Sequence, residues 1–312
     1  MVLPTIFTAW AGWWKTRALE KVIQRIAAGK TWPICIAGFE TDELPGEKIT
    51  LLLQDKIYHA VTDHEGYFLF DIVPPEPIVS DALYFGLPLS AGYAGDQAAA
   101  VAEVMIPPAG AEYGVISDID DTIIQTGATS IVGMLKTVLL ANAFTRLPFE
   151  GAADFYRALQ KGRNGINNNP FFYVSSSPWN LYDLITDFMD IQELPQGPLL
   201  LRDFGIRSKT FVTHDYLGHK FKEISQVLET YPHLNFLLIG DSGEEDPVIY
   251  HEVVRHFPGR ILAVYIRDVK NEAKRKVAKE MGEKIHAMGV EALVTDSSVE
   301  AMNHALSVGL IS

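Results

Sequence analysis

The sequence predicts an α/β protein in which a β-rich N-terminal domain precedes a doubly wound, mostly parallel sheet. In the first third, short runs of β-branched and aromatic residues are separated by turn signals. From Val115 onward, short apolar runs alternate with stretches of helical spacing, as in sheets covered by helices on both faces. Pro107–Gly110 is a loop signal between the two patterns. We therefore expect domains at residues 1–110 and 111–312.

The N-terminal domain is predicted to be a small antiparallel sandwich. Turn residues at Gln54–Lys56 and Asp63–Gly66 separate its strands. Arg17–Ala28 has helical spacing and stands apart from this pattern. The expected strands are Lys48–Leu53, Ile57–Thr62 and Tyr67–Phe70.

The second domain is predicted from its alternation of strands and helices, and ligands of such sheets bind beyond the carboxyl ends of the strands. The expected strands are Val115–Ile116, Phe171–Val174, Pro198–Leu201, Phe236–Ile239, Ile261–Ile266 and Ala292–Val294. The expected helices are Ile131–Ala143, Ala152–Gln160, Leu181–Met189, Phe221–Glu229, Val248–His256, Asn271–Met288 and Ser298–Ser307.

Composition narrows the classes of partner. The net charge of −13 argues against nucleic acid, whose phosphates need basic patches, and against unaided docking on anionic membranes. Any membrane contact is therefore expected to be peripheral. The single cysteine, Cys35, excludes an intrachain disulfide, and the apolar run Met1–Trp14 lacks the charge order of a secretory signal. A cytoplasmic location is expected, and no pattern indicates an oligomeric state.

The stretch Val115–Ile124 runs from an apolar strand into Asp118, Asp120, Asp121 and Thr122. Like charges at the end of a buried strand are costly to desolvate. A bound cation would offset this repulsion, and Asp-x-Asp spacing lets two acids turn toward one point. An acidic helix cap explains the same residues, so this stretch alone leaves both interpretations open.

Polar side chains also follow other strands of the predicted sheet. The hydroxyls of Ser175–Ser177 follow one apolar strand, and the acids Asp241 and Asp246 follow another. Lys220 enters a helix between them. Carboxylates hold Mg²⁺, while hydroxyls, amides and an ammonium hold a phosphoryl group. The combination favours a metal site at one edge of the sheet over a helix cap.

Four longer motifs narrow the prediction: Ser117–Ile123, Tyr173–Trp179, Leu201–Gly205 and Gly240–Gly243. Together they resemble the phosphatidate phosphatase catalytic-domain family, within the haloacid dehalogenase-like (HAD-like) superfamily of aspartate-nucleophile phosphohydrolases. The resemblance covers about Glu112–Leu310. It implies a HAD-like fold with a small helical cap at about residues 125–169.

The resemblance implies roles for the acids. Asp118 attacks phosphorus, and Asp120 protonates the leaving oxygen and later deprotonates water. Mg²⁺ is the implied cofactor, bound by Asp118, the Asp120 backbone carbonyl and Asp241, with Asp246 or Glu245 close by. Asp121 does not occupy a motif position and is expected to cap the turn.

The resemblance also implies a phosphomonoester substrate. Ser175 and Lys220 bind the phosphoryl oxygens, with Lys222 as the alternative lysine, and Thr122 completes the phosphate site by orienting its loop. Phosphatidate, giving diacylglycerol, is the implied substrate, and a small soluble phosphomonoester is the alternative. A non-catalytic binding or scaffold protein acting through the N-terminal domain is a further alternative. The intact set of acids, hydroxyls and lysine counts against it, since a decayed enzyme is expected to lose Asp118 or Asp120.

Overall fold

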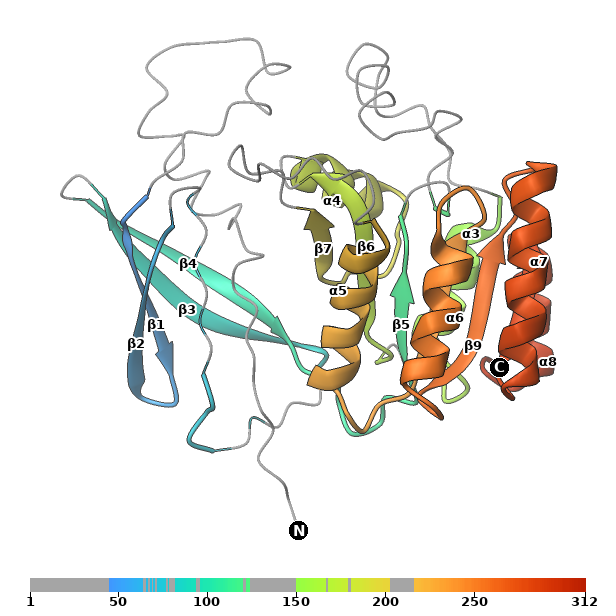
Figure 1. The fold of residues 1–312 in the computed structure, drawn as a ribbon. Coiled ribbons are helices and arrows are strands. Elements are labelled where there is room, and N and C mark those ends of the chain that lie inside the picture. The colour runs from blue at the N-terminus through green and yellow to red at the C-terminus, as the bar shows by residue number, and fades with distance from the viewer. Residues whose placement is uncertain are drawn as a thin grey trace. The chain divides into compact units, whose positions relative to one another are not determined.

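The computed structural model describes residues 45–63, 66, 68, 70, 72–76, 78, 82–93, 96–119, 122–123, 150–166, 168–178, 181–202 and 216–312. The chain divides into two compact units, Met1–Ala109 and Gly110–Ser312, and each is described by itself (Figure 1). Among the helices in the described part of the chain, none has the length and apolar character needed to cross a membrane.

The N-terminal unit contains a four-stranded antiparallel sheet with the order β2-β1-β3-β4. Its strands are β1 (Lys48–Leu53), β2 (Lys56–Val61), β3 (Tyr84–Tyr93) and β4 (Asp96–Met105). Gln54 and Asp55 link β1 to β2 with φ values of 48° and 60°, the left-handed backbone that two-residue hairpin turns require. Alternate residues of β1 are buried, so one face of this sheet carries the core.

The first two predicted strands are confirmed, the second beginning one residue earlier than expected. The predicted strand Tyr67–Phe70 is wrong at its two described positions: Phe68 and Phe70 lie outside any strand and pack edge-to-face in the core, with ring centroids 5.8 Å apart. β3 and β4 were not predicted. The described residues of the N-terminal unit form one sheet, so the sandwich stays a prediction. The predicted helix Arg17–Ala28 lies outside the described residues.

The C-terminal unit contains a six-stranded sheet with the order β10-β9-β8-β5-β6-β7, and every neighbouring pair is parallel. Each predicted strand of this domain is confirmed within a few residues. The strands are β5 (Gly114–Ser117), β6 (Phe171–Pro178), β7 (Leu199–Arg202), β8 (Phe236–Asp241), β9 (Ile261–Arg267) and β10 (Glu291–Thr295).

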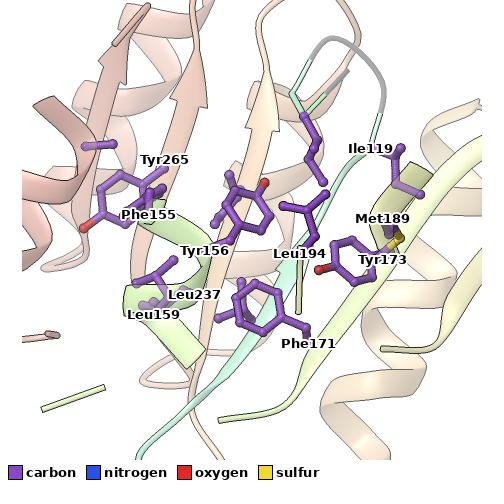
Figure 2. Close-up of a cluster of buried hydrophobic side chains, with 14 of the residues drawn as sticks. Ile119, Phe155, Tyr156, Leu159, Phe171, Tyr173, Met189, Leu194, Leu237 and Tyr265 are labelled. Carbon is purple, nitrogen blue, oxygen red and sulfur yellow. The ribbon is translucent and has the colours of Figure 1, made fainter. Parts of the chain in front are cut away.

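Helices cover both faces of this sheet. On one face, α3 (Ala152–Lys161), α4 (Tyr182–Ile191) and α8 (Ser298–Ser307) enclose the apolar core drawn in Figure 2. On the other face lie α5 (Tyr216–Thr230), α6 (Asp246–His256) and α7 (Glu272–Ala287), the row of helices in front of the sheet in Figure 1. All six residues of β8 are buried, as expected for a strand covered on both sides.

The predicted helices of this domain are confirmed, apart from Ile131–Ala143, which lies outside the described residues. The predicted cap at about residues 125–169 includes α3. Phe155, Tyr156 and Leu159 of α3 are buried in the core against the sheet. Residues 125–149 of this range lie outside the described residues, and the cap stays a prediction.

The buried side chain of Asn169 joins the start of β5 to α3. Its Oδ1 accepts hydrogen bonds from the Glu112 amide at 2.8 Å and the Tyr113 amide at 3.4 Å, and its Nδ2 donates to the Leu159 carbonyl at 2.9 Å. We expect Asn169→Ala to lower the free energy of unfolding by about 2–4 kcal/mol, because each orphaned buried group costs about 1–3 kcal/mol. Urea denaturation of the variant measures this loss.

The neighbouring Asn168 supplies the control. It is also buried, but its Oδ1 has no hydrogen-bond partner among the described residues. We expect Asn168→Ala to cost less than about 1 kcal/mol. Equal losses in the two variants would contradict a joining role for Asn169.

Candidate functional site

The order of the strands singles out one place at the edge of the C-terminal sheet. From β5 the chain moves through β6 to β7 on one side, and then returns to place β8, β9 and β10 on the other side. Adjacent strands β5 and β8 therefore form the switch point, where the crevice beyond the carboxyl ends binds ligands in open α/β sheets. Asp118 directly follows β5, and Asp241 is the last residue of β8.

Three aspartates gather at this switch point. Asp118, Asp241 and Asp246 are all buried, and one carboxylate oxygen of each lies within 4.8 Å of the others. The Asp118 amide donates to the Ile239 carbonyl at 2.8 Å, which ties the end of β5 to β8. Asp246 begins α6, and its Oδ2 accepts a hydrogen bond from the Asp241 amide at 3.2 Å. Backbone hydrogen bonds thus hold the main chain of Asp118 beside β8 and the carboxylate of Asp246 beside Asp241.

Gly240 makes room for this arrangement. A Cβ added to Gly240 would collide with Oδ2 of Asp246 and would lie 2.8 Å from the Tyr250 hydroxyl. The glycine of the Gly240–Gly243 motif is therefore required by the close approach of Asp246 to the end of β8.

Lys220 of α5 reaches into the acid cluster. Its Nζ lies 3.0 Å from Asp118 Oδ1 and 2.7 Å from Asp246 Oδ1, and it also lies 2.8 Å from Glu244 Oε2. Lys220 is buried, whereas Lys222 is exposed. Of the two lysines considered from the sequence, Lys220 is the one that the fold places beside the aspartates.

The charges in this cluster perturb one another strongly. Burial alone lowers the pKa of Lys220, but the attraction of the surrounding carboxylates outweighs it and holds that pKa well above its usual range. Burial, followed by the negative charge of Asp246, raises the pKa of Asp241 to about 8. Burial also raises the pKa of Asp246, against the opposing attraction of Lys220. The site thus favours the charged form of Lys220 and the protonated forms of Asp241 and Asp246.

Of the two hydroxyl groups predicted from the sequence, that of Thr122 contacts the cluster and that of Ser175 lies on the strand beside β5. Thr122 Oγ1 donates to Asp118 Oδ2 at 3.3 Å. Ser175 is buried in β6, the strand beside β5, and its Oγ accepts a hydrogen bond from the Ser177 amide at 3.0 Å. The pairing of β6 with β7 is irregular between Val174 and Pro178, and such bulges often redirect side chains next to active sites.

Asp120 and Asp121 lie outside the described residues, so their roles stay predictions. Glu244 was not predicted as a site residue, although it contacts Lys220. It belongs to the acidic run Glu244–Asp246, and nothing in that run distinguishes it from Glu245, which lies outside the cluster of three aspartates. Of the two acids proposed to complete the metal site, the structure brings Asp246 to Asp118 and Asp241.

The donor set fits a hard divalent cation. Three carboxylates converge, and oxygen ligands of this kind suit Mg²⁺ and comparable ions. Oδ1 of Asp241 accepts hydrogen bonds from the amides of Gly243 and Glu244. Oδ2 of Asp241 is buried and has no hydrogen-bond partner among the described residues. A buried oxygen without a donor is costly, and a cation would satisfy it.

Comparison with known proteins points to one family. Residues 113–268, half of the 312-residue chain, match the family model described as "Phosphatidate phosphatase APP1, catalytic domain". The matched range contains β5 through β9 and every described site residue. No solved structure matches the chain significantly.

Two curated fungal proteins are similar to the chain. Phosphatidate phosphatase APP1 of Saccharomyces cerevisiae is 32% identical over 159 residues, which is 51% of this chain and 26% of the relative. An uncharacterized protein of Schizosaccharomyces pombe is 29% identical over 223 residues, covering 69% of this chain and 35% of the relative. The matches span about a quarter to a third of the length of these relatives.

Proposed function

Because the chain belongs to the family of the phosphatidate phosphatase APP1 catalytic domain, a family of phosphoric monoester hydrolases, we propose that it hydrolyses a phosphomonoester in a Mg²⁺-dependent reaction through an aspartyl-phosphate. The observation that carries the proposal is the position of Asp118. Its buried carboxylate lies at the switch point between Lys220 and Thr122, beside two further acids.

In the first step, a carboxylate oxygen of Asp118 forms a bond to phosphorus and the bond from phosphorus to the ester oxygen breaks. Asp120 donates a proton to the leaving oxygen, so that an alcohol departs. This role of Asp120 follows from its motif position. Lys220 and Thr122 hold the Asp118 carboxylate in place, which limits the motion needed for attack.

In the second step, a water molecule attacks phosphorus and gives its proton to Asp120. The bond from phosphorus to Asp118 breaks, which releases inorganic phosphate and restores the carboxylate. Ser175 and Lys220 bind the phosphoryl oxygens in both steps. A Mg²⁺ held by Asp118, Asp241 and Asp246 would screen the phosphoryl charge from the carboxylates.

We propose phosphatidate as the substrate, with diacylglycerol as the product, because the family model and the Saccharomyces cerevisiae relative carry that name. The enzyme would meet this lipid as a peripheral protein at a membrane surface, in keeping with the cytoplasmic location expected from the sequence.

The test is an assay of purified protein with and without Mg²⁺ on p-nitrophenyl phosphate, phosphatidate vesicles and a panel of soluble phosphomonoesters. We expect Mg²⁺-dependent phosphate release, with turnover of phosphatidate depending on its surface concentration. Turnover of soluble esters alone would overturn the lipid substrate. If the protein hydrolyses none of these esters, the proposed phosphatase activity is wrong and a non-catalytic binding or scaffold function is favoured.

Mg²⁺ binding is expected to depend on pH through Asp241. With no Mg²⁺ added, burial and the charge of Asp246 raise the pKa of Asp241 to about 8. A carboxyl group must release its proton to bind a metal. The dissociation constant for Mg²⁺ should therefore increase by about tenfold for each pH unit below 8, as for one displaced proton. Isothermal titration calorimetry at pH 6, 7 and 8 measures this constant.

The same pKa shift predicts the pH dependence of stability. A carboxyl whose pKa is raised on folding favours the folded state only while it is protonated, so protein without Mg²⁺ should lose stability as the pH rises from about 4 to about 8. Added Mg²⁺ should restore stability most at pH 8. Asp241→Asn is the control: it should lose the stabilisation by Mg²⁺ and show a smaller pH dependence, because only the raised pKa of Asp246 then contributes. Equal Mg²⁺ affinity at pH 6 and pH 8 would contradict the role of Asp241.

A further inference from the structure

The ammonium group of Lys220 is already surrounded by three carboxylates. A lysine ammonium offers three N–H donors. Nζ donates hydrogen bonds to Asp118 Oδ1 at 3.0 Å and to Asp246 Oδ1 at 2.7 Å, and Glu244 Oε2 lies 2.8 Å away as its third ion-pair partner. A phosphoryl oxygen can bind Lys220 only if one of these carboxylates leaves.

Burial decides which carboxylate can leave. The side chains of Asp118 and Asp246 are 1% and 0% exposed, whereas the side chain of Glu244 is 38% exposed. Moving either aspartate away would leave a charge buried without its partner, which is strongly unfavourable. Glu244 can turn its carboxylate into water by rotating about its side-chain bonds.

The backbone beneath Glu244 is anchored, so the movement is confined to the side chain. The Glu244 amide donates to Asp241 Oδ1 at 3.0 Å. The preceding Gly243 donates its amide to the same oxygen, and its carbonyl accepts a hydrogen bond from Lys274. The loop can therefore keep the metal-site carboxylate of Asp241 in place while Glu244 changes its position.

The balance of charge favours this exchange. With Mg²⁺ bound, the charges of the three aspartates are cancelled by the cation and Lys220, and Glu244 adds one negative charge beside the place of the phosphoryl group. Like charges this close repel, the more so where water is excluded. When Glu244 turns outward, the net charge of the three aspartates, Mg²⁺ and Lys220 is zero, so these groups together do not repel an incoming anion.

We propose that Glu244 competes with the phosphoryl group of the substrate for Lys220 and thereby sets the affinity of the site for phosphate esters. The inference rests on the proposed function, since it places a phosphoryl anion on Lys220. Glu244 is a specificity-determining residue in this scheme. Because the ester must displace the Glu244 carboxylate from Lys220, anions that bind the site weakly cannot occupy it. It takes no part in bond making or bond breaking.

The test compares Glu244→Gln and Glu244→Ala with the wild-type protein, using inorganic phosphate in the presence of Mg²⁺. Isothermal titration calorimetry gives the dissociation constant of phosphate, and steady-state kinetics on p-nitrophenyl phosphate give KM and kcat. We expect phosphate to bind about fivefold more tightly to both variants, the size of an ion pair with one exposed partner. KM should fall by a similar factor while kcat changes less than KM.

Glu280→Gln is a matched control, because Glu280 also lies 2.8 Å from a lysine, Lys284, but on the surface of α7. This variant should bind phosphate as the wild type does. Unchanged or weaker phosphate binding in both Glu244 variants would overturn the competition, while hydrolysis by the wild type would leave the proposed function standing. If no variant binds phosphate and none hydrolyses an ester, the proposed function fails and this inference fails with it.

Discussion

Replacing Asp118 by asparagine should reduce turnover of p-nitrophenyl phosphate by about 10⁴-fold or more, the scale on which loss of a catalytic nucleophile acts. Asparagine keeps the shape of the side chain but removes the nucleophilic carboxylate. The variant should remain folded, because Lys220 keeps its ion pairs with Asp246 and Glu244. Steady-state kinetics and thermal denaturation of the same preparation measure both expectations.

A covalent intermediate gives a second measurement. Rapid acid quenching of the wild-type reaction should leave one phosphoryl group on the peptide that contains Asp118, detectable by mass spectrometry. The control is Asp154→Asn, which changes an exposed aspartate paired with Arg157 on α3 and should leave turnover unchanged. Activity of Asp118→Asn within tenfold of the wild type would rule out Asp118 as the nucleophile.

Replacing Lys220 by alanine should abolish activity and destabilise the fold. Lys220 neutralises two buried aspartates, and removing one partner of a buried ion pair costs about 3–5 kcal/mol because a charge stays buried without its partner. The loss should be smaller at pH 5 than at pH 8, since Asp246, whose pKa is raised by burial, binds a proton more readily at low pH. Urea denaturation at the two pH values measures the effect.

Two further variants separate charge from folding. Lys222→Ala removes an exposed lysine of the same helix and should change stability by less than about 0.5 kcal/mol. Lys220→Met keeps much of the side-chain volume, so that it tests the loss of charge with less disturbance of packing. If Lys220→Met were as stable and as active as the wild type, Lys220 would have neither role.

The C-terminal sheet could be predicted from the sequence because its strands are covered on both faces. Strands such as β8 begin with an uninterrupted apolar run, Phe236–Ile239, and the helices between the strands have clear helical spacing. Once the strands are parallel, the residues that follow them must meet at one edge. The convergence of Asp118 and Asp241 could therefore be predicted without any knowledge of side-chain positions.

β3 and β4 of the N-terminal sheet could not be predicted because they contain residues that are unusual in strands. β4 contains Ala98, Ala99 and Ala100, and alanine is depleted in strands. β3 contains Pro88, which normally excludes a central strand. The observed pairing explains the presence of Pro88. β1 pairs with β3 only at Leu89–Ala91, so β1 requires no backbone N–H from Pro88.

Details of the site depended on side-chain directions that no pattern encodes. Lys220 and Lys222 are two positions apart on α5, and only the packing of that helix decides which one reaches Asp118. Glu244 is directed by hydrogen bonds between its loop and Asp241, which are tertiary contacts. The sequence therefore predicts the chemistry of the site and its edge of the sheet, while the individual partners require the fold.

The strand order also has a consequence for the newly made chain. β5, β6 and β7 leave the ribosome well before β8, which lies about 120 residues after β5 and is its second neighbour in the sheet. Until β8 is synthesised, β5 has an open edge whose backbone groups lack partners, and such edges promote aggregation. During that interval Asp118 lacks its backbone bond to Ile239. Asp118 therefore does not meet Asp241 until β8 has joined the sheet, and the repulsion between these two carboxylates arises only in the late stages of folding.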